Sequence, residues 1–141
     1  AGYKFCMNNI SAAIGLSQLP HIDSIINKHK QNAETYASCF KDNDKVTPLT
    51  FTENSEPSHW VYTVLLNPSV DRNSVIENLN DSGIGAAIVH LPCHNYSCFN
   101  EDYKELPETD YFYQHQISLP CGWWLEEEDI KNISQSLEEF L

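Results

Sequence analysis

Residues 90–98 bring together the side chains best suited to chemistry, because they read His-Leu-Pro-Cys-His-Asn-Tyr-Ser-Cys, with two imidazoles and two thiols. Zinc prefers such ligands, but it usually takes them in pairs such as Cys-x-x-Cys, and the chain has no second pair. Cys93 and His94 could act as nucleophile and base, yet adjacent side chains rarely point at each other. We therefore predict no metal site and no catalytic residue here, and ordinary loop and core roles as the default.

Other common functional motifs are absent from the sequence. It has no glycine-rich phosphate loop, no serine nucleophile elbow and no His-Glu-x-x-His motif. Its 20 acidic and 8 basic residues give a net charge of −12, which argues against nucleic-acid binding. No apolar run approaches the roughly 18 residues that cross a membrane. Five irregularly spaced cysteines, an odd number, favour reduced thiols in a cytoplasmic protein.

Helical patterns mark the two ends of the chain. Apolar residues cluster before Pro20 and then recur every three or four positions up to Phe40, which predicts two helices or one long kinked helix. Three glutamates at residues 126–128 suit the first turn of a terminal helix, where the helix dipole favours negative charge. The apolar stripe of that helix comprises Ile130, Ile133, Leu137 and Phe140.

The middle of the chain alternates between strand and helix patterns. β-Branched and aromatic residues predict strands at residues 59–66, 84–91 and 116–119. Residues 71–80 predict a short helix with Gly83 as its C-terminal stop, and a further helix is expected just before the last strand. The strand at 84–91 is apolar on both faces, which predicts a central position in a strand–helix–strand crossover, right-handed if parallel. These patterns describe a single α+β unit.

Three segments, in this order and spacing, resemble the DegT/StrS-type sugar aminotransferases. GYKFCMNNISAAIGLSQL (residues 2–19) is similar to the stretch that follows that family's lysine-bearing region. SGIGAAIVHLPCHNYSCF (82–99) is similar to its Gly-Ile and His-x-Pro-x-His loop, and ISLPCGWWLEEEDI (117–130) to its Leu-Pro turn before the final helix. The resemblance covers essentially the whole chain and is closest to a branch that acts on keto-deoxy-sugar nucleotides.

The resemblance implies the fold and the missing parts. This chain would be the small C-terminal domain of a fold-type I pyridoxal phosphate (PLP) enzyme, and we expect one domain at residues 1–141. A helical arm at 1–40 would precede an α+β unit at 41–141, whose short mixed or antiparallel sheet is covered by helices on one side. The Schiff-base lysine would lie in a missing N-terminal PLP domain, so the chain alone would bind no PLP. The family also implies a homodimer with the active site at the interface.

The resemblance also implies site residues. Lys4 stands where relatives have an asparagine that reaches the partner's cofactor phosphate, and a lysine could do this as a point charge. Cys6 replaces the usual arginine. His90 and His94 match the loop that lies near the nucleotide sugar in relatives, which implies substrate contact.

The implied activity is transfer of an amino group from an amino acid, namely glutamate, to a keto-deoxy-sugar nucleotide. Two alternatives stay open: a stand-alone non-catalytic interaction or dimerisation module, and an unrelated ferredoxin-like binding domain. Exposure of the apolar residues near Leu16 would mark where a missing domain or partner sits. Trp123 and Trp124 are expected to pack under the final helix rather than to form a sugar-stacking platform.

Overall fold

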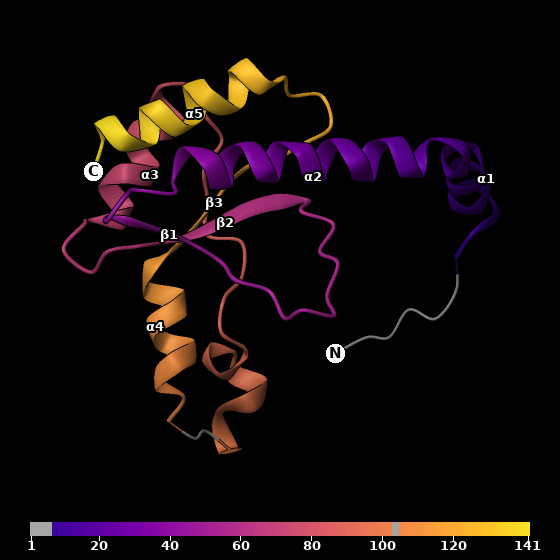
Figure 1. Ribbon diagram of the computed structural model, residues 1–141. Helices are drawn as coiled ribbons and strands as arrows, with labels where there is room; N and C mark the ends of the chain where they lie inside the picture. Colours follow the sequence, from indigo (N-terminus) through magenta and orange to yellow (C-terminus); the bar gives the residue numbers. More distant parts are fainter. Residues whose placement is uncertain (1–6, 103–104) are drawn as a thin grey trace.

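The computed structural model describes residues 7–102 and 105–141, so Lys4 and Cys6 lie outside the described residues (Figure 1). Its helices and strands follow in chain order: α1 (Asn9–Gln18), the 3₁₀ helix η1 (Leu19–His21), α2 (Ile22–Cys39), β1 (Val46–Pro48), β2 (Val61–Leu66), α3 (Arg72–Asp81), the 3₁₀ helices η2 (Cys93–Asn95) and η3 (Ser97–Asp102), α4 (Pro107–His115), β3 (Gln116–Pro120) and α5 (Glu127–Glu139). None of the helices in this part of the chain is both long and apolar enough to cross a lipid bilayer.

The N-terminal arm consists of two helices, as predicted, joined through η1. The side chain of Asn8 caps α1 by accepting a hydrogen bond from the Ser11 amide at 2.8 Å. Pro20 lies in the first turn of η1, where its missing N–H leaves no helical bond unmade. No residue of α1 is buried, and Leu16 is 68% exposed, so the apolar side of this helix has no partner among the described residues.

The sheet has three strands in the order β1-β2-β3, with both pairs antiparallel. The strands expected near 59–66 and 116–119 are confirmed as β2 and β3, and the sheet is antiparallel throughout. Burial alternates along β2, as a strand with one covered face requires. Tyr62 and Val64 face this covered side opposite Leu119 and Ile117 of β3. The short strand β1 was not predicted, since its three residues carry too little pattern.

Helices α2, α3 and α5 cover one face of the sheet, whereas α4 extends from the other side (Figure 1). Tyr36 of α2 is at the centre of the core, because its ring stacks on Tyr62 at 4.6 Å and on Phe40 at 6.0 Å between ring centroids. The other buried apolar residues are Ala33, Val46, Val64, Leu66, Val75, Leu79, Ala86, Ile117, Leu119, Cys121, Ile130, Ile133 and Leu137.

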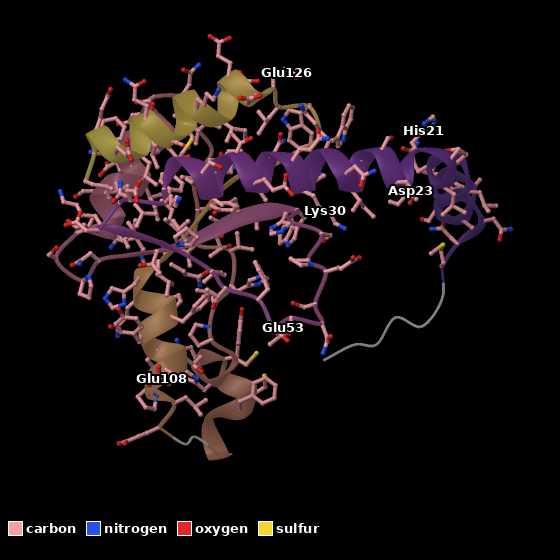
Figure 2. The ribbon with its side chains drawn as sticks, in the orientation of Figure 1. His21, Asp23, Lys30, Glu53, Glu108 and Glu126 are labelled. Carbon is pink, nitrogen blue, oxygen red and sulfur yellow. The ribbon has the colours of Figure 1, made fainter. Side chains whose placement is uncertain are left out.

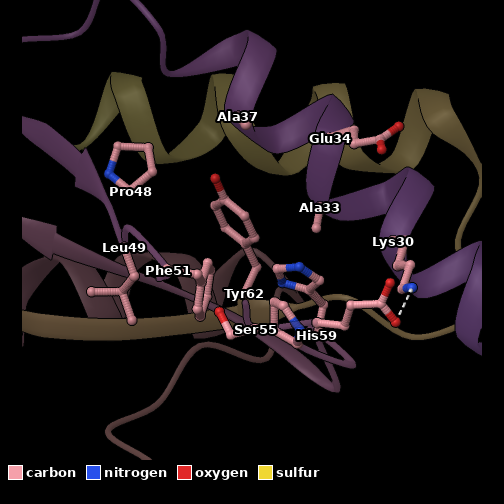
Figure 3. Close-up of a pocket in the computed structure, with 12 residues that line it drawn as sticks. Lys30, Ala33, Glu34, Ala37, Pro48, Leu49, Phe51, Ser55, His59 and Tyr62 are labelled. Carbon is pink, nitrogen blue, oxygen red and sulfur yellow. Dashed lines mark ion pairs between the residues drawn. The ribbon is translucent and has the colours of Figure 1, made fainter. Parts of the chain in front are cut away.

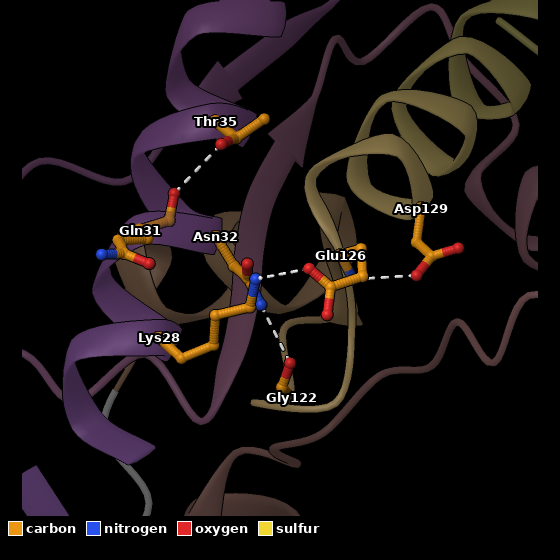
Figure 4. A network of polar contacts seen from close by, with 7 residues as sticks. All are labelled: Lys28, Gln31, Asn32, Thr35, Gly122, Glu126 and Asp129. Atoms are coloured by element: carbon orange, nitrogen blue, oxygen red, sulfur yellow. Dashed lines mark hydrogen bonds and ion pairs between the residues drawn. The ribbon is translucent and has the colours of Figure 1, made fainter. Parts of the chain in front are cut away.

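The C-terminal helix is held by its own capping and by ties to α2. Glu126 and Asp129 form a reciprocal capping box, which satisfies two backbone N–H groups that the helix leaves unpaired. Figure 4 shows the ties to α2: Asn32 Nδ2 donates to the Gly122 carbonyl at 2.9 Å, and Lys28 Nζ lies 3.1 Å from Glu126. Asn32 is buried, so its hydrogen bond satisfies an amide that would otherwise be costly to bury.

The expected strand at residues 84–91 is wrong, and so is the crossover built on it. Only Ala87 pairs, with Ser118 of β3 and in antiparallel sense, so the segment lies beside β3 rather than at the centre of the sheet. Apart from Ala87, backbone carbonyls of the segment bond to side chains: Asn80 Nδ2 donates to the Ala86 carbonyl at 2.9 Å, and Gln116 Nε2 donates to the His90 carbonyl at 2.9 Å.

The expected packing of Trp123 and Trp124 under the final helix is also wrong, because their side chains are 54% and 65% exposed. The two rings contact each other nearly at right angles, with their centroids 6.0 Å apart. The Trp124 ring instead lies over Gly122, where an added Cβ would come within 2.3 Å of it. Glycine at position 122 therefore makes room for the ring.

Helix α3 ends as predicted at Gly83, which has a φ of 82°. The Gly83 amide donates to the Asn80 carbonyl at 2.9 Å, and the Ile84 amide donates to the Leu79 carbonyl at 2.9 Å. This is the Schellman arrangement, and it places Ile84 against the core.

Gly83→Ala is expected to lower the free energy of unfolding by about 1 kcal/mol, because a Cβ disfavours the left-handed conformation. Nothing lies within 4 Å of the added Cβ, so the loss measures backbone strain alone. Urea unfolding followed by circular dichroism would give this value. Gly85→Ala is the matched control, since Gly85 also has open space and no positive φ, and it should not be destabilising. Equal effects of the two variants would contradict the assignment.

Helix α3 begins at an acidic cap whose contribution depends on pH. The Asp71 carboxylate accepts hydrogen bonds from the Ser74 hydroxyl at 2.8 Å and the Asn73 amide at 3.1 Å. These bonds, with that of Ser74 largest, hold the pKa of Asp71 below its usual value. A carboxyl whose pKa is lower in the folded chain stabilises it above the unfolded pKa and stops doing so as pH falls through the folded pKa. Asp71→Ala should therefore melt below the wild type at neutral pH, and the gap should close in thermal scans as pH falls through the lowered pKa of Asp71.

Candidate functional site

The loop that carries His90 and His94 crosses the sheet face opposite the main core. Side chains alternate along β3, so Gln116 and Ser118 face away from buried Ile117. Ser118 Oγ lies 2.9 Å from Thr63 Oγ1 of β2, and Gln116 Nε2 donates to the His90 carbonyl at 2.9 Å. The polar side of two paired strands therefore fixes where the loop begins.

A cavity of about 360 Å³ opens beside this loop. Its wall includes the rings of Trp60 and His90, whose centroids are 6.3 Å apart with planes tilted by 60°. The complete lining is Leu49, Phe51, Pro57, Ser58, His59, Trp60, Val61, Tyr62, Thr63, His90, Phe112 and Gln116. No Asp, Glu, Lys or Arg side chain is in this lining, so the cavity is aromatic and largely uncharged.

Gln116 contributes an unsatisfied acceptor to this region. The residue is 1% exposed, and its buried Oε1 has no hydrogen-bond partner among the described residues. The amide cannot be turned around, because the His90 carbonyl only accepts hydrogen bonds and must face Nε2. A buried acceptor left unpaired costs about 1–3 kcal/mol. Such an acceptor is expected to pair with a ligand or with a water molecule.

The structure separates the two histidines that the sequence singled out. His90 borders the cavity, but His94 does not. His94 Nε2 instead lies 2.9 Å from Asp110 Oδ1 of α4, and only 10% of its side chain is exposed. A carboxylate in this position fixes the orientation of an imidazole ring. His94 thus ties the loop to α4, while His90 faces the cavity.

His59 has a strained backbone between β1 and β2. Its φ is 50°, in the left-handed region that non-glycine residues rarely adopt. A hydrogen bond from His29 Nδ1 to the His59 carbonyl, at 2.9 Å, stabilises this conformation. Burial and the neighbouring Lys30 and His29 lower the pKa of His59, which favours its neutral ring. Strained residues concentrate at functional sites.

His59 also borders a second cavity of about 350 Å³, on the α2 side of the same loop (Figure 3). Lys30 lines this cavity. Its amine is the kind of group that forms a Schiff base with PLP, the expected cofactor. Lys30 Nζ is 3.6 Å from Glu56, however, and Glu34 lines the same cavity. Two carboxylates beside one ammonium would repel a phosphate. This cavity therefore does not fit the phosphate of PLP.

Metal binding finds no support in the part of the chain that is described. No group of three or more His, Cys, Asp or Glu side chains lies close enough there to hold an ion. None of the described cysteines forms a disulfide: Cys93 and Cys98 are exposed, Cys39 is half-buried and Cys121 is buried. The labelled acidic residues Asp23, Glu53 and Glu108 are exposed at the surface (Figure 2).

Sequence reasoning identified His90 but missed Trp60 and Gln116. The sequence predicts that Trp60 belongs to a strand, whereas it precedes β2 and is 60% exposed. Gln116 had only one signal, its place on the polar side of a predicted strand. Nothing in the sequence alone shows that its side chain is buried beneath the loop.

Known proteins similar to this chain include several sugar aminotransferases. The UDP-4-amino-4,6-dideoxy-N-acetyl-beta-L-altrosamine transaminase of Helicobacter pylori is 31% identical over 140 residues, which is 96% of this chain and 37% of that protein. The sugar aminotransferase CalS13 of Micromonospora echinospora superimposes with a TM-score of 0.88 at 29% identity, covering 99% of this chain and 37% of CalS13. Spr1654 of Streptococcus pneumoniae in its PLP form gives a TM-score of 0.83 at 26% identity, covering 99% of this chain and 38% of Spr1654.

These relatives are longer proteins, because the chain spans between 37% and 38% of their lengths. Their match extends across the helical arm, the sheet and the terminal helix alike. The family model covers an equally continuous stretch, residues 1–138, and the chain therefore belongs to the DegT/DnrJ/EryC1/StrS aminotransferase family.

Proposed function

We propose that this chain is the C-terminal portion of an enzyme that transfers an amino group from glutamate to a keto-deoxy-sugar nucleotide. The observation that carries the proposal is the similarity to sugar aminotransferases along essentially the whole chain, in sequence and in fold. The chain acts as one domain, residues 1–141, in which residues 1–40 form the helical arm. The whole enzyme is a cytoplasmic homodimer.

The catalytic lysine belongs to the PLP domain that precedes this chain. In support, the described lysines are committed to surface contacts or exposed. Lys28 and Lys131 lie 3.1 and 2.6 Å from Glu126 and Glu127, and Lys45 Nζ donates to the Leu141 carbonyl at 2.8 Å. Lys30 faces Glu56, and Lys41 is exposed. The chain alone is therefore inactive and binds no PLP.

The substrate meets this chain at the loop on the uncovered sheet face. Of the two histidines, His90 contacts the substrate at the cavity, whereas His94 positions the loop through its contact with Asp110. Lys4 would reach the cofactor phosphate of the partner subunit. PLP acts as the electron sink of transamination when it is bound in the whole enzyme. This chain positions the sugar beside it and excludes water.

The exposed apolar side chains of α1 pack against the rest of the enzyme. They are Ile10, Ile14 and Leu16, together with the flanking residues Met7 and Leu19, each well exposed. Five exposed apolar side chains on and beside one short helix are more than singly scattered surface residues would explain. The same observation favours the second candidate function, a stand-alone non-catalytic dimerisation module. Sedimentation of the chain alone separates the two: a tight dimer that α1 substitutions abolish would favour the module.

A chimera tests the proposed function. Residues 1–141 replace the matched segment of the Helicobacter pylori relative, and 2-oxoglutarate formation from glutamate is followed with its keto-sugar nucleotide. We expect formation that depends on the nucleotide sugar, as in a control that carries the relative's own segment. A folded, PLP-loaded chimera without such activity would contradict the proposal.

The chain alone provides the complementary experiment. It is titrated with PLP, reduced with borohydride and examined by mass spectrometry. We expect no stoichiometric adduct at any one lysine. A single modified lysine at full occupancy would overturn the assignment of the catalytic lysine to another domain.

A further inference from the structure

The buried amide of Gln116 offers an acceptor at a cavity that is otherwise aromatic and uncharged. Its Nε2 is used by the His90 carbonyl, so Oε1, which is covered in this structure, is the polar atom left for a ligand that uncovers it. That ligand must present an N–H or O–H group, because an amide oxygen only accepts hydrogen bonds.

The lining decides which part of a nucleotide sugar would fit. A diphosphate calls for Lys, Arg or a metal ion, and the cavity lining has no lysine or arginine. His59 does not replace them, because its lowered pKa favours the neutral imidazole ring. The uncharged part of the molecule is therefore the candidate: the sugar or the base.

The hydrogen-bonding pattern favours the sugar. A uracil-like base has one ring N–H between two carbonyl groups, so it needs donors on both sides of its own donor. Gln116 has no donor left for them, and Thr63 Oγ1 is engaged with Ser118. A sugar hydroxyl both donates and accepts, so it matches a lone acceptor. The exposed ring of Trp60 offers the apolar surface on which the face of a pyranose can pack.

We infer that Gln116 is a specificity-determining residue: its Oε1 accepts a hydrogen bond from the sugar of the nucleotide-sugar substrate, in the cavity walled by Trp60 and His90. The inference rests on the proposed function for the identity of the ligand. His90 serves twice, since its ring borders the sugar cavity and its carbonyl orients the Gln116 amide.

The experiment is a nuclear magnetic resonance titration of the 141-residue chain, observing the Gln116 side-chain amide and the Trp60 indole. The probes are UDP-N-acetylglucosamine, N-acetylglucosamine and UDP. We expect saturable shifts of both groups with the first two probes and none with UDP. Equal shifts with UDP would overturn the assignment to the sugar. The absence of any saturable shift would mean that solvent alone pairs with Oε1, and would overturn the inference.

Substitutions separate binding from loop support. Gln116→Leu removes the acceptor and should weaken sugar binding about threefold to tenfold, as loss of one hydrogen bond does. Gln116→Glu keeps an oxygen acceptor at the same place but loses the Nε2 donor to the His90 carbonyl, so it should weaken sugar binding less than Gln116→Leu does. A purely structural role predicts no such difference, so equal losses in the two variants would contradict a sugar contact.

Trp60→Phe should weaken the sugar probes, whereas Trp123→Phe is the matched control, because Trp123 is similarly exposed and does not line the cavity. Equal weakening by both would overturn the site. The inference and the proposed function can be refuted separately. An active chimera together with a Gln116 side chain that does not respond to the sugar would refute only the sugar contact.

Discussion

Tyr36→Ala should lower the free energy of unfolding by about 3–5 kcal/mol, the range for removing a large buried ring. Tyr36 is fully buried and stacks on Phe40 and Tyr62, so the substitution opens a cavity where α2 meets the sheet. Its hydroxyl also donates to the Pro120 carbonyl at 2.7 Å, next to the turn that leads to α5. Urea unfolding of the two proteins, followed by circular dichroism, gives the difference.

Tyr36→Phe isolates the hydroxyl from the ring. We expect a loss of about 0.5–1.5 kcal/mol, the usual worth of one hydrogen bond. Burial raises the pKa of the Tyr36 hydroxyl, so the group stays protonated and able to donate at neutral pH. If Phe and Ala destabilised the chain equally, the ring stack would not be the main contribution, and this account of the core would fail.

Leu137→Ala is the second large loss, at about 2–5 kcal/mol. Leu137 is fully buried on the apolar stripe of α5, together with Ile130 and Ile133. Truncating it removes packing between α5 and the rest of the core, and the ordered neighbours can fill the space only in part. The midpoint of urea unfolding should fall, with little change in its slope.

Leu16→Ala is the matched control for Leu137→Ala. The chemical change is the same, but Leu16 is exposed on α1, so the stability of the chain should change by no more than about 0.5 kcal/mol. A loss comparable to that of Leu137→Ala would mean that α1 is already covered in solution. It would thereby favour the dimerisation module over the enzyme portion.

Periodicity predicted the elements whose burial repeats along the chain. The stripe of α5 matches a helix that lies on a core, and Gly83 ends α3 where the left-handed conformation was expected. β2 was found because its β-branched and aromatic residues form a continuous run, although its start lies two residues later than expected. In these cases the local pattern and the tertiary environment agree.

The errors share a different cause, namely competition from tertiary contacts. Residues 84–91 have the composition of a buried strand, but the side chains of Asn80 and Gln116 occupy backbone carbonyls of this segment. Trp123 and Trp124 have the composition of core residues, yet the turn that carries them is tied to α2 by Asn32. Neither contact can be read from residues close in sequence.

The candidate site was predictable only where a family pattern marked it. His90 and His94 came from such a pattern, and the structure then gave them different surroundings. Gln116 and Trp60 lie 56 positions apart in sequence and border one cavity only because β2 and β3 bring the two parts of the chain together. A single sequence has no signal for that pairing.

The single bridge between Ala87 and Ser118 has a consequence for solubility. β3 ends the sheet, and an uncovered edge strand of five residues offers unpaired backbone groups to another molecule. The segment at 84–91 lies along this edge and pairs with its middle residue, while the opposite edge strand is only three residues long and ends in Pro48, which cannot donate a hydrogen bond. Both edges of the sheet are thereby protected against intermolecular strand pairing, the first step of aggregation.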